Sequence, residues 1–442
     1  MNTLASREPS KQKKTIVAAL ANYIDAGSIV AGSAGLSLWV DYLGLNDSQI
    51  GLLGAMSANA ISAAIGALIG GYLADKVGRK KIYTTSMVAY ALGTLLIVFG
   101  VNFPMLLVGY IIAGIAVGAD ITASWTIIAE NAPKEKRARH AGMAQVAWAL
   151  GAVIVMLLSV LLGGMGLLGN RIVFAHLLVI SLITLILRLR LPESEAWKSR
   201  QVHQKQGMIE RKTYRHLFQR KFLRSILFLM GVYLVWNLAA GVMGFFMPYI
   251  YQKVGGVSAT AANLLQMGYF TFTGLAVALI FMVFADKHRR KVYAFSALLA
   301  VAGWSLLLLP VDGIPILVLF IILMGINNGS GQQANYQLWS SELFPTSLRA
   351  SAQGFMFFAV RITLGIWSVF VPMLLTDFGI REVAAILVVF VFISFLIGTL
   401  FAPSTSGKSL EEIQLELYGE PKPPLFSNKG SSADLVEPKN EF

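Results

Sequence analysis

Long apolar stretches separated by short polar loops fill the sequence between residues 15 and 402. A helix needs about 20 mainly apolar residues to cross the hydrocarbon core of a bilayer, and twelve stretches approach that length. They lie at 15–40, 49–74, 82–101, 104–130, 140–163, 170–190, 222–250, 259–284, 292–310, 314–340, 350–375 and 382–402. The pattern predicts an all-α membrane protein with twelve transmembrane helices.

Two polar motifs recur where these stretches end. Residues 130–137 and 342–349 both read Glu-x-x-Pro-x-x-x-Arg, at an offset of 212 residues. Residues 75–81 and 286–291 both begin with Asp-Lys and join two apolar stretches, at an offset of 211 residues. Charges gather wherever a chain leaves a membrane, but this does not explain an ordered triplet repeated in register. The repeat predicts two similar halves, each crossing the membrane several times.

The boundaries of these halves follow from polar segments. We predict two pseudo-symmetric six-helix bundles, residues 1–191 and 222–403. Residues 192–221 form the one long polar insertion and are expected to be a cytoplasmic linker. Residues 404–442 are polar and rich in Pro and Lys, so we expect a cytoplasmic tail that is largely disordered, with the disorder beginning after Leu417.

Composition supports a bilayer protein. The chain has 442 residues, of which 56% are apolar and 13% charged, whereas soluble domains carry about 25% charged residues. It contains no cysteine, which excludes disulfides and thiolate metal sites. The N-terminus lacks the short apolar core and the small-residue cleavage site of a signal peptide.

The positions of the basic residues predict the orientation. If both termini are cytoplasmic, 32 of the 36 Lys and Arg residues lie in cytoplasmic segments. The outer loops hold three, Arg171, Lys253 and Arg381, and the last, Arg361, falls inside a predicted span. Cytoplasmic loops are enriched in Lys and Arg. The basic residues behind the net charge of +13 therefore favour membrane orientation over a nucleic-acid interface. We expect the protein in a bacterial inner membrane, with both termini cytoplasmic.

Three ionisable residues fall near the middle of predicted spans: Asp25, Asp120 and Arg361. An ionisable group inside a membrane costs several kcal/mol unless it is paired or hydrated, so each is a functional candidate. One interpretation is a buried ion pair between Arg361 and one of the two Asp residues. The interpretation we favour is that at least one Asp exchanges a proton, with Asp25 as the leading carrier and Asp120 as the second.

Neutral polar and aromatic residues occur in the same spans. The candidates for substrate binding are Gln145, Trp236, Asn237, Gln332, Gln333 and Gln337, with Trp39, Trp148 and Trp339 as further flat apolar faces. A helix so rich in amides cannot face lipid. The amides either bond to neighbouring helices or line a wet cavity. Arg361 suggests a substrate with a carboxylate, because a guanidinium binds that group in a two-pronged fashion.

Enzymatic chemistry has no support in the sequence. The Gly-rich Gly-Lys-Ser/Thr loop that cradles phosphates is absent, which argues against ATP-driven transport within this chain. The five His residues show no metal-ligand spacing. We therefore expect neither a cofactor nor a metal, and no catalytic residues.

Several motifs resemble those of one family. Residues 70–81, Gly-Gly-Tyr-Leu-Ala-Asp-Lys-Val-Gly-Arg-Lys-Lys, resemble the signature loop between the second and third spans of the major facilitator superfamily. Residues 342–349 are similar to the motif at the end of the tenth span in its sugar porter group. Residues 192–194 and 407–413 resemble that group's motifs after the sixth and twelfth spans.

The resemblance implies roles for particular residues. In the sugar porter group an Asp in the first span carries the coupling proton of symporters, and Asp25 matches its position. A Gln eight residues after the first-half Arg contacts sugar, and Gln145 matches it. In that group, cytoplasmic clusters of acidic residues and Arg stabilise the outward-facing state. The resemblance assigns this gating role to Asp75, Arg79, Glu130, Arg137, Asp286, Arg290, Glu342 and Arg349.

Other positions depart from the group's pattern. Tyr110 stands where members place an Arg as partner of the coupling Asp. Trp236 falls within the position of a Gln pair, and Gln333 and Gln337 replace a Gly and a Trp. Arg361 lies at or beside sugar-contacting positions. These differences argue against a neutral hexose.

These observations predict a proton-coupled secondary transporter that imports a small polar metabolite (a sugar, a polyol, or a sugar acid or other organic anion) by alternating access. Its partners would be this substrate, protons and the lipid bilayer, with no nucleic acid, and it would act as a monomer. One alternative is an efflux antiporter for amphipathic compounds, favoured by the many Met and Phe residues. A second alternative is a nutrient sensor that does not transport.

Overall fold

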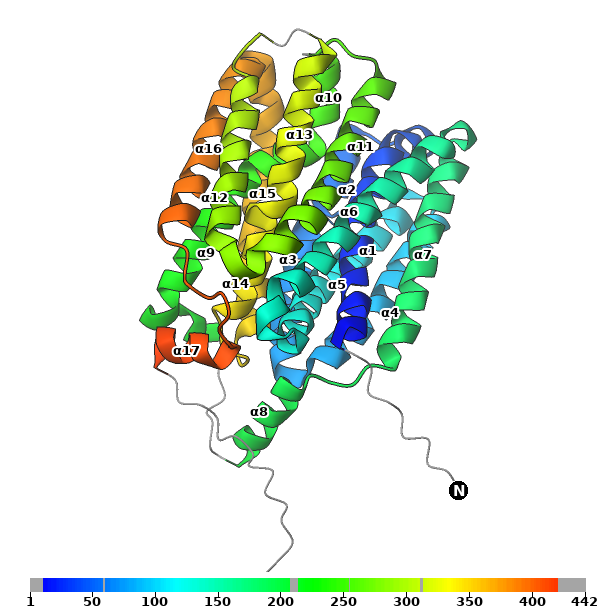
Figure 1. Ribbon diagram of the computed structural model, residues 1–442. Coiled ribbons are helices and arrows are strands. Elements are labelled where there is room, and N and C mark those ends of the chain that lie inside the picture. Colours follow the sequence, from blue (N-terminus) through cyan, green and yellow to red (C-terminus); the bar gives the residue numbers. More distant parts are fainter. Residues whose placement is uncertain (1–10, 59, 207–213, 254, 311–312, 420–442) are drawn as a thin grey trace, which may run out of the picture.

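The structure is a computed structural model that describes residues 11–58, 60–206, 214–253, 255–310 and 313–419. The described residues form helices joined by short turns and contain no β-strand, which confirms the predicted all-α class. Figure 1 shows two bundles side by side, one built by the first half of the chain and one by the second.

The helices follow the predicted spans. The first bundle contains α1 (Lys11–Leu43), α2 (Asp47–Ala55), α3 (Ile61–Val77), α4 (Arg79–Val98), α5 (Phe103–Asn131), α6 (Arg137–Leu161) and α7 (Leu167–Leu189). The second contains α9 (Arg220–Phe245), α10 (Met247–Lys253), α11 (Ala259–Ala276), α12 (Met282–Leu306), α13 (Ile314–Ser330), α14 (Gln332–Glu342), α15 (Arg349–Asp377) and α16 (Ile380–Leu400). Outside the bundles lie α8 (Glu195–Lys205) and α17 (Leu410–Tyr418).

Among the described residues, nine helices are long and apolar enough to cross a membrane. One of them, Ala261–Leu306, covers two predicted spans and bends at His288, where φ is −126° and ψ is 36°. The predicted spans 49–74 and 350–375 correspond to α3, which follows a break after α2, and to α15. The helices are therefore consistent with the predicted twelve spans.

Small residues bring the two bundles together where α3 crosses α15. A Cβ atom on Gly71 would lie 2.3 Å from the carbonyl oxygen of Ala350, and one on Gly354 would lie 2.2 Å from that of Ala67. Glycine at such positions lets helix backbones approach closely inside a bilayer. A second crossing, between α6 and α11, also joins the bundles.

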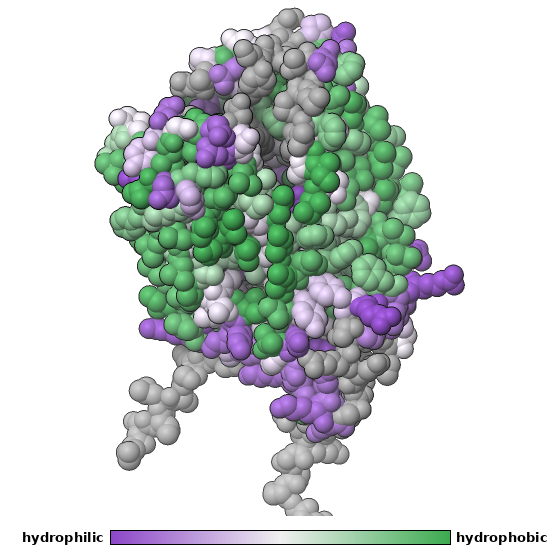
Figure 2. All heavy atoms as spheres, turned by 180° about the vertical axis from the view of Figure 1, so that it is seen from behind, coloured by the Kyte–Doolittle hydropathy of each residue, from purple (hydrophilic) through white to green (hydrophobic). Residues whose placement is uncertain are grey.

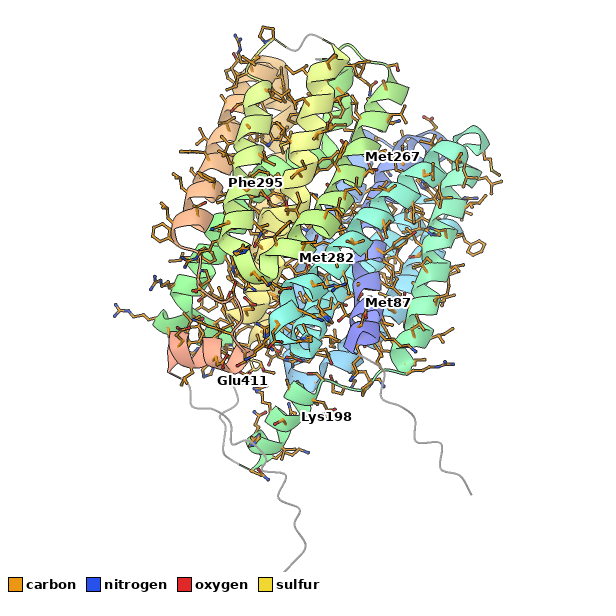
Figure 3. The ribbon with its side chains drawn as sticks, in the orientation of Figure 1. Met87, Lys198, Met267, Met282, Phe295 and Glu411 are labelled. Atoms are coloured by element: carbon orange, nitrogen blue, oxygen red, sulfur yellow. The ribbon has the colours of Figure 1, made fainter. Side chains whose placement is uncertain are left out.

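We call the end of the molecule where α8 and α17 lie the linker end. Figure 3 shows Lys198 on α8 and Glu411 on α17 at this end. In Figure 2 apolar residues cover the middle of the molecule and hydrophilic residues gather at the linker end, as expected for a membrane protein.

The first part of the predicted disordered tail is helical. In α17 the Tyr418 hydroxyl donates to the carbonyl of Leu343 at 2.6 Å, and the Ser409 side chain caps the helix N-terminus. The start of the tail therefore contains a helix, and the disorder expected after Leu417 stays a prediction. Residues 420–442 lie outside the described part of the chain.

Candidate functional site

A cavity of about 800 Å³ lies between the bundles. Its wall includes Gly163, in the turn after α6, and the exposed Gln252 of α10, both far from the linker end. Met267 of α11 also lines it and is labelled in the upper half of Figure 3. The cavity therefore opens away from the linker end, where Figure 2 shows a hollow between two lobes.

Asp25 lies in the cavity wall, about halfway along α1. The indole Nε1 of Trp148 donates to its Oδ2 atom at 2.9 Å. Its Oδ1 atom is buried and has no hydrogen-bond partner among the described residues. Arg361 of α15 lines the same cavity and acts on this carboxyl group electrostatically. The site thus holds an acid with one oxygen fixed and one available to a proton.

The cavity collects six of the predicted functional residues: Asp25, Trp148, Trp236, Asn237, Gln333 and Arg361. Gln333 accepts a hydrogen bond from the Tyr233 hydroxyl at 2.9 Å, and Asn237 donates to the Tyr233 carbonyl at 3.1 Å. The guanidinium of Arg361 lies 4.7 Å from the ring centre of Phe357. These contacts hold polar groups of α9, α14 and α15 against the cavity.

The other predicted amides do not line the cavity. Gln145 donates to Gln337 at 2.5 Å and links α6 to α14 on the side of the linker end. Gln332 accepts from Asn327 at 2.7 Å and is fully buried. In this state these residues make helix-to-helix hydrogen bonds, which was the alternative interpretation of the amide-rich tenth span.

Further amides that were not predicted as binding residues line the cavity, and two of them have a side-chain atom without a partner in the described part of the chain. Asn22 of α1 and Gln266 of α11 line it, and the Nδ2 atom of Asn22 and the Oε1 atom of Gln266 are buried without a hydrogen-bond partner among the described residues. They offer one donor and one acceptor to a ligand. Both are amides inside apolar stretches, so the signal that identified the other candidates was present here too.

Asp120 lies outside the cavity wall, in an ion pair with Arg188 of α7. Arg188 Nη2 donates to Oδ2 at 2.9 Å, and the Ser86 hydroxyl of α4 donates to Oδ1 at 2.9 Å. Arg188 also lies 3.7 Å from the ring centre of Tyr83. The structure thus pairs Asp120 with Arg188 and not with Arg361. The pair joins three helices of the first bundle, which favours a structural role for Asp120.

A first cluster of charges at the linker end surrounds Glu130. Its Oε1 atom accepts from Arg79 at 3.2 Å and from Arg349 of the second bundle at 2.9 Å. Asp75 forms an ion pair with Arg79 at 2.9 Å and accepts from the backbone N–H of Ser351 at 2.8 Å. Four of the predicted gating residues therefore join the two bundles.

A second cluster surrounds Glu342, which accepts from Arg137 of the first bundle at 3.0 Å and from Arg289 at 2.5 Å. Asp286 accepts from the backbone N–H of Ala138 at 2.7 Å. The predicted gating residue Arg290 does not contact Glu342 in this state and instead donates to the backbone carbonyl of Ala402. The backbone at His288 is non-helical, which changes the direction in which the residues after it point. Arg289, and not Arg290, therefore faces Glu342.

The two clusters close the linker end while the cavity is open at the other end. Ion-paired hydrogen bonds between the bundles are among the stronger polar contacts in proteins. Rocking of two bundles about a central site is the established way in which transporters built from internal repeats expose that site to one side at a time. The geometry matches one of the two end states of such a cycle.

Comparison with known proteins identifies the family. Residues 15–269 and 237–431 match the model of the Major Facilitator Superfamily. The chain belongs to this superfamily. The family and the twelve-helix fold predicted from the sequence are thereby confirmed, and the protein is a membrane transporter.

Relatives within the superfamily are similar over nearly the whole chain. The chain is 69% identical to the minor myo-inositol transporter IolF of Bacillus subtilis over 429 residues, 96% of this chain and 98% of that one. It is 25% identical to the arabinose-proton symporter of the same organism, over 88% and 90% of the two chains. A solved structure of the proton:xylose symporter XylE superposes with a TM-score of 0.79 at 20% identity, over 92% and 98%.

Replacing Asp120 with Ala is expected to lower the stability of the fold, because Asp120 lies outside the cavity wall and is paired with Arg188. Removing one member of a buried ion pair leaves the other uncompensated, at a cost of about 3–5 kcal/mol. Thermal unfolding of purified Asp120→Ala would measure this loss. The double variant Asp120→Ala with Arg188→Met should recover part of it. Equal melting temperatures for Asp120→Ala and the unchanged protein would contradict a structural pair.

Proposed function

We propose that the protein is a proton-coupled importer of myo-inositol or of a closely related cyclic polyol. The observation that carries the substrate is the 69% identity, over nearly full length, with a protein named as a myo-inositol transporter. Such a substrate is an uncharged ring with a hydroxyl on every carbon. The cavity of about 800 Å³ lies in the size range of small-molecule sites.

The cavity wall suits such a ligand. The unpaired donor of Asn22 and the unpaired acceptor of Gln266 can bond to hydroxyl groups. Trp236 lines the cavity and offers flat apolar surface to the C–H face of a ring. Arg361, which suggested a substrate carboxylate, acts electrostatically on Asp25. Because the carboxylate of Asp25 already lies near Arg361, the substrate does not need to carry a carboxylate of its own.

Asp25 is the proposed proton carrier. Its Oδ1 atom is buried, unpaired among the described residues and part of the cavity wall. Its affinity for a proton depends on the distance to the guanidinium of Arg361, because a nearby cation favours the ionised carboxylate. Asp25 and Arg361 belong to different bundles, so rocking of the bundles changes that distance. Proton release is thereby linked to the change of access.

The proposed cycle follows from the state in the structure. The linker end faces the cytoplasm of a bacterium, both termini lie on that side, and the open end of the cavity faces outward. Asp25 takes up a proton and the cavity takes up the polyol. The cavity then closes on the outer side while the clusters around Glu130 and Glu342 part. Polyol and proton leave to the cytoplasm, and one chain is sufficient for the cycle.

Uptake by purified protein in liposomes tests this proposal. With an acidic exterior, labelled myo-inositol should accumulate above its external concentration, and a protonophore should abolish the accumulation. Unlabelled cyclic polyols should compete, whereas glucuronate should compete at least about tenfold less well. Accumulation driven by the opposite pH gradient would indicate the efflux antiporter, and the absence of counterflow exchange would indicate a sensor.

A further inference from the structure

Trp148 of α6 is in direct contact with the proposed proton carrier. Its indole Nε1 donates to Asp25 Oδ2 at 2.9 Å. Helices α1 and α6 are pressed together beside this bond, since a Cβ on Gly151 would lie 2.3 Å from the backbone oxygen of Tyr23. Gly151 is three residues from Trp148, and Tyr23 is two from Asp25. Such close backbone packing fixes the positions from which the indole and the carboxylate meet.

The ring of Trp148 also touches the second bundle. Phe270 of α11 lies edge-on to it, with ring centres 5.8 Å apart and planes at 65°. Both rings line the cavity, and α6 and α11 form one of the crossings between the bundles. The indole is thus held between the carboxylate of its own bundle and an aromatic ring of the other bundle. Edge-to-face aromatic pairs favour such a defined orientation.

The chemistry of the indole distinguishes the two oxygens of Asp25. An indole N–H can donate a hydrogen bond but cannot accept one. It therefore occupies Oδ2 and favours the ionised carboxylate. The Oδ1 atom, buried and unpaired among the described residues, is the atom that remains for a proton.

Other ionisable groups face Asp25 from the surrounding helices. Arg361 of α15, Asp120 of α5, Tyr90 of α4 and Tyr233 of α9 each act on it electrostatically. On α7, His176 is hydrogen-bonded to Tyr23 at 2.9 Å. Asp120 is held by Arg188. Arg361 is thus the cation that acts from the second bundle, whereas Trp148 supplies a fixed hydrogen bond from the first.

We propose that Trp148 is a positioning residue of the proton site: it holds Oδ2 of Asp25 so that Oδ1 takes the proton, and it sets the pH at which proton-driven uptake is lost. The inference rests on the proposed function, because it requires Asp25 to carry the coupling proton. It assigns to α6 a role that is separate from binding the polyol.

The variant Trp148→Phe tests this inference, because it keeps an aromatic ring beside Phe270 and removes only the N–H donor. Without the donor the ionised form of Asp25 is less favoured, so Asp25 stays protonated to higher pH. The pH at which proton-driven uptake of myo-inositol falls to half should rise by about one unit, as expected for a hydrogen bond to a charged group. Trp148→Leu also lacks the donor and must shift the midpoint in the same direction.

Trp39→Phe is the matched control. Trp39 also donates its indole N–H to a first-bundle side chain, Asn170 at 3.0 Å, and it lies outside the cavity wall. Loss of the Trp39 indole N–H should leave the pH of half-maximal uptake within about 0.2 units of that of the unchanged protein. This is well below the shift of about one unit expected for Trp148→Phe. An unchanged midpoint in both Trp148 variants, or an equal shift in Trp39→Phe, overturns the inference.

Counterflow exchange in an Asp25→Asn background separates this inference from the proposed function. If Trp148 acts through Asp25, adding Trp148→Phe to Asp25→Asn leaves the exchange rate within about twofold, a difference of about 0.4 kcal/mol in activation free energy. A tenfold loss in the double variant shows a merely structural role and overturns the inference. Accumulation that persists in Asp25→Asn alone instead refutes the proposed proton carrier, whatever the Trp148 variants do.

Discussion

Replacing Asp25 with Asn is expected to abolish accumulation of myo-inositol and to leave counterflow exchange intact. Asn has nearly the same shape, and its side-chain oxygen can still accept from Trp148, so the cavity should keep its form. An amide cannot carry a proton between the two sides. With one proton per substrate, each unit of pH gradient sustains about a tenfold accumulation ratio, and this ratio should fall to one.

Asp41→Asn is the control for this substitution. Asp41 is on the same helix, but it is exposed near the open end and does not line the cavity. Both variants are reconstituted and assayed for gradient-driven uptake and for counterflow. Accumulation by Asp25→Asn at the level of the unchanged protein would exclude Asp25 as the carrier. Loss of counterflow as well as accumulation would instead place Asp25 in substrate binding.

Replacing Gly354 with Ala is expected to disturb the crossing of α3 and α15 and to lower uptake by about tenfold or more. The new Cβ would lie 2.2 Å from the backbone oxygen of Ala67, so the helices must move apart. Overpacking of this kind costs about 1–3 kcal/mol. The contacts of Ser351 with Asp75 and of Arg349 with Glu130 lie within five residues of Gly354, so they should weaken together.

Gly365→Ala provides the comparison on the same helix. A Cβ there would meet no atom within 4 Å, and Ala in a helix is favoured over Gly by up to about 1 kcal/mol. It should keep full uptake and melt no lower than the unchanged protein. Melting temperature and initial uptake rate are measured for both variants. If the two Ala substitutions behave alike, the close approach of α3 and α15 does not matter.

Much of the architecture could be predicted because a bilayer imposes a long apolar stretch on every crossing. The break between α2 and α3 was not predictable from apolar length alone, since residues 49–74 are mainly apolar and contain only scattered polar residues such as Ser57 and Asn59. The helical start of the tail was missed because α17 has only nine residues and is held by contacts with distant segments.

The cavity was predicted less completely than the fold. Asp25 and Arg361 could be identified because an ionisable residue inside a membrane span is costly and is therefore a functional candidate. The partner of Asp120 could not, because Arg188 follows the apolar core of α7 and meets Asp120 only through tertiary packing. In α14 the direction of the amides was equally hidden. Gln332 and Gln337 are 0% and 1% exposed, so the helix has no polar face that a pattern could reveal.

The choice between Arg289 and Arg290 shows a different limit. Counting four residues on from Asp286, by analogy with Asp75 and Arg79, gives Arg290. The chain bends at His288, so equal spacing no longer means equal direction. A repeat in the sequence therefore predicts which segment carries a contact more reliably than which residue makes it.

The charged contacts around Glu130 and Glu342 have a kinetic consequence in the proposed orientation. These contacts stabilise the empty carrier in its outward-facing state, so the inward-facing empty form is rare. Solute already stored in the cell then seldom finds a vacant carrier through which to escape. The final concentration ratio is unaffected, since the ion gradient alone determines it, but back-leak is slowed when that gradient fails briefly.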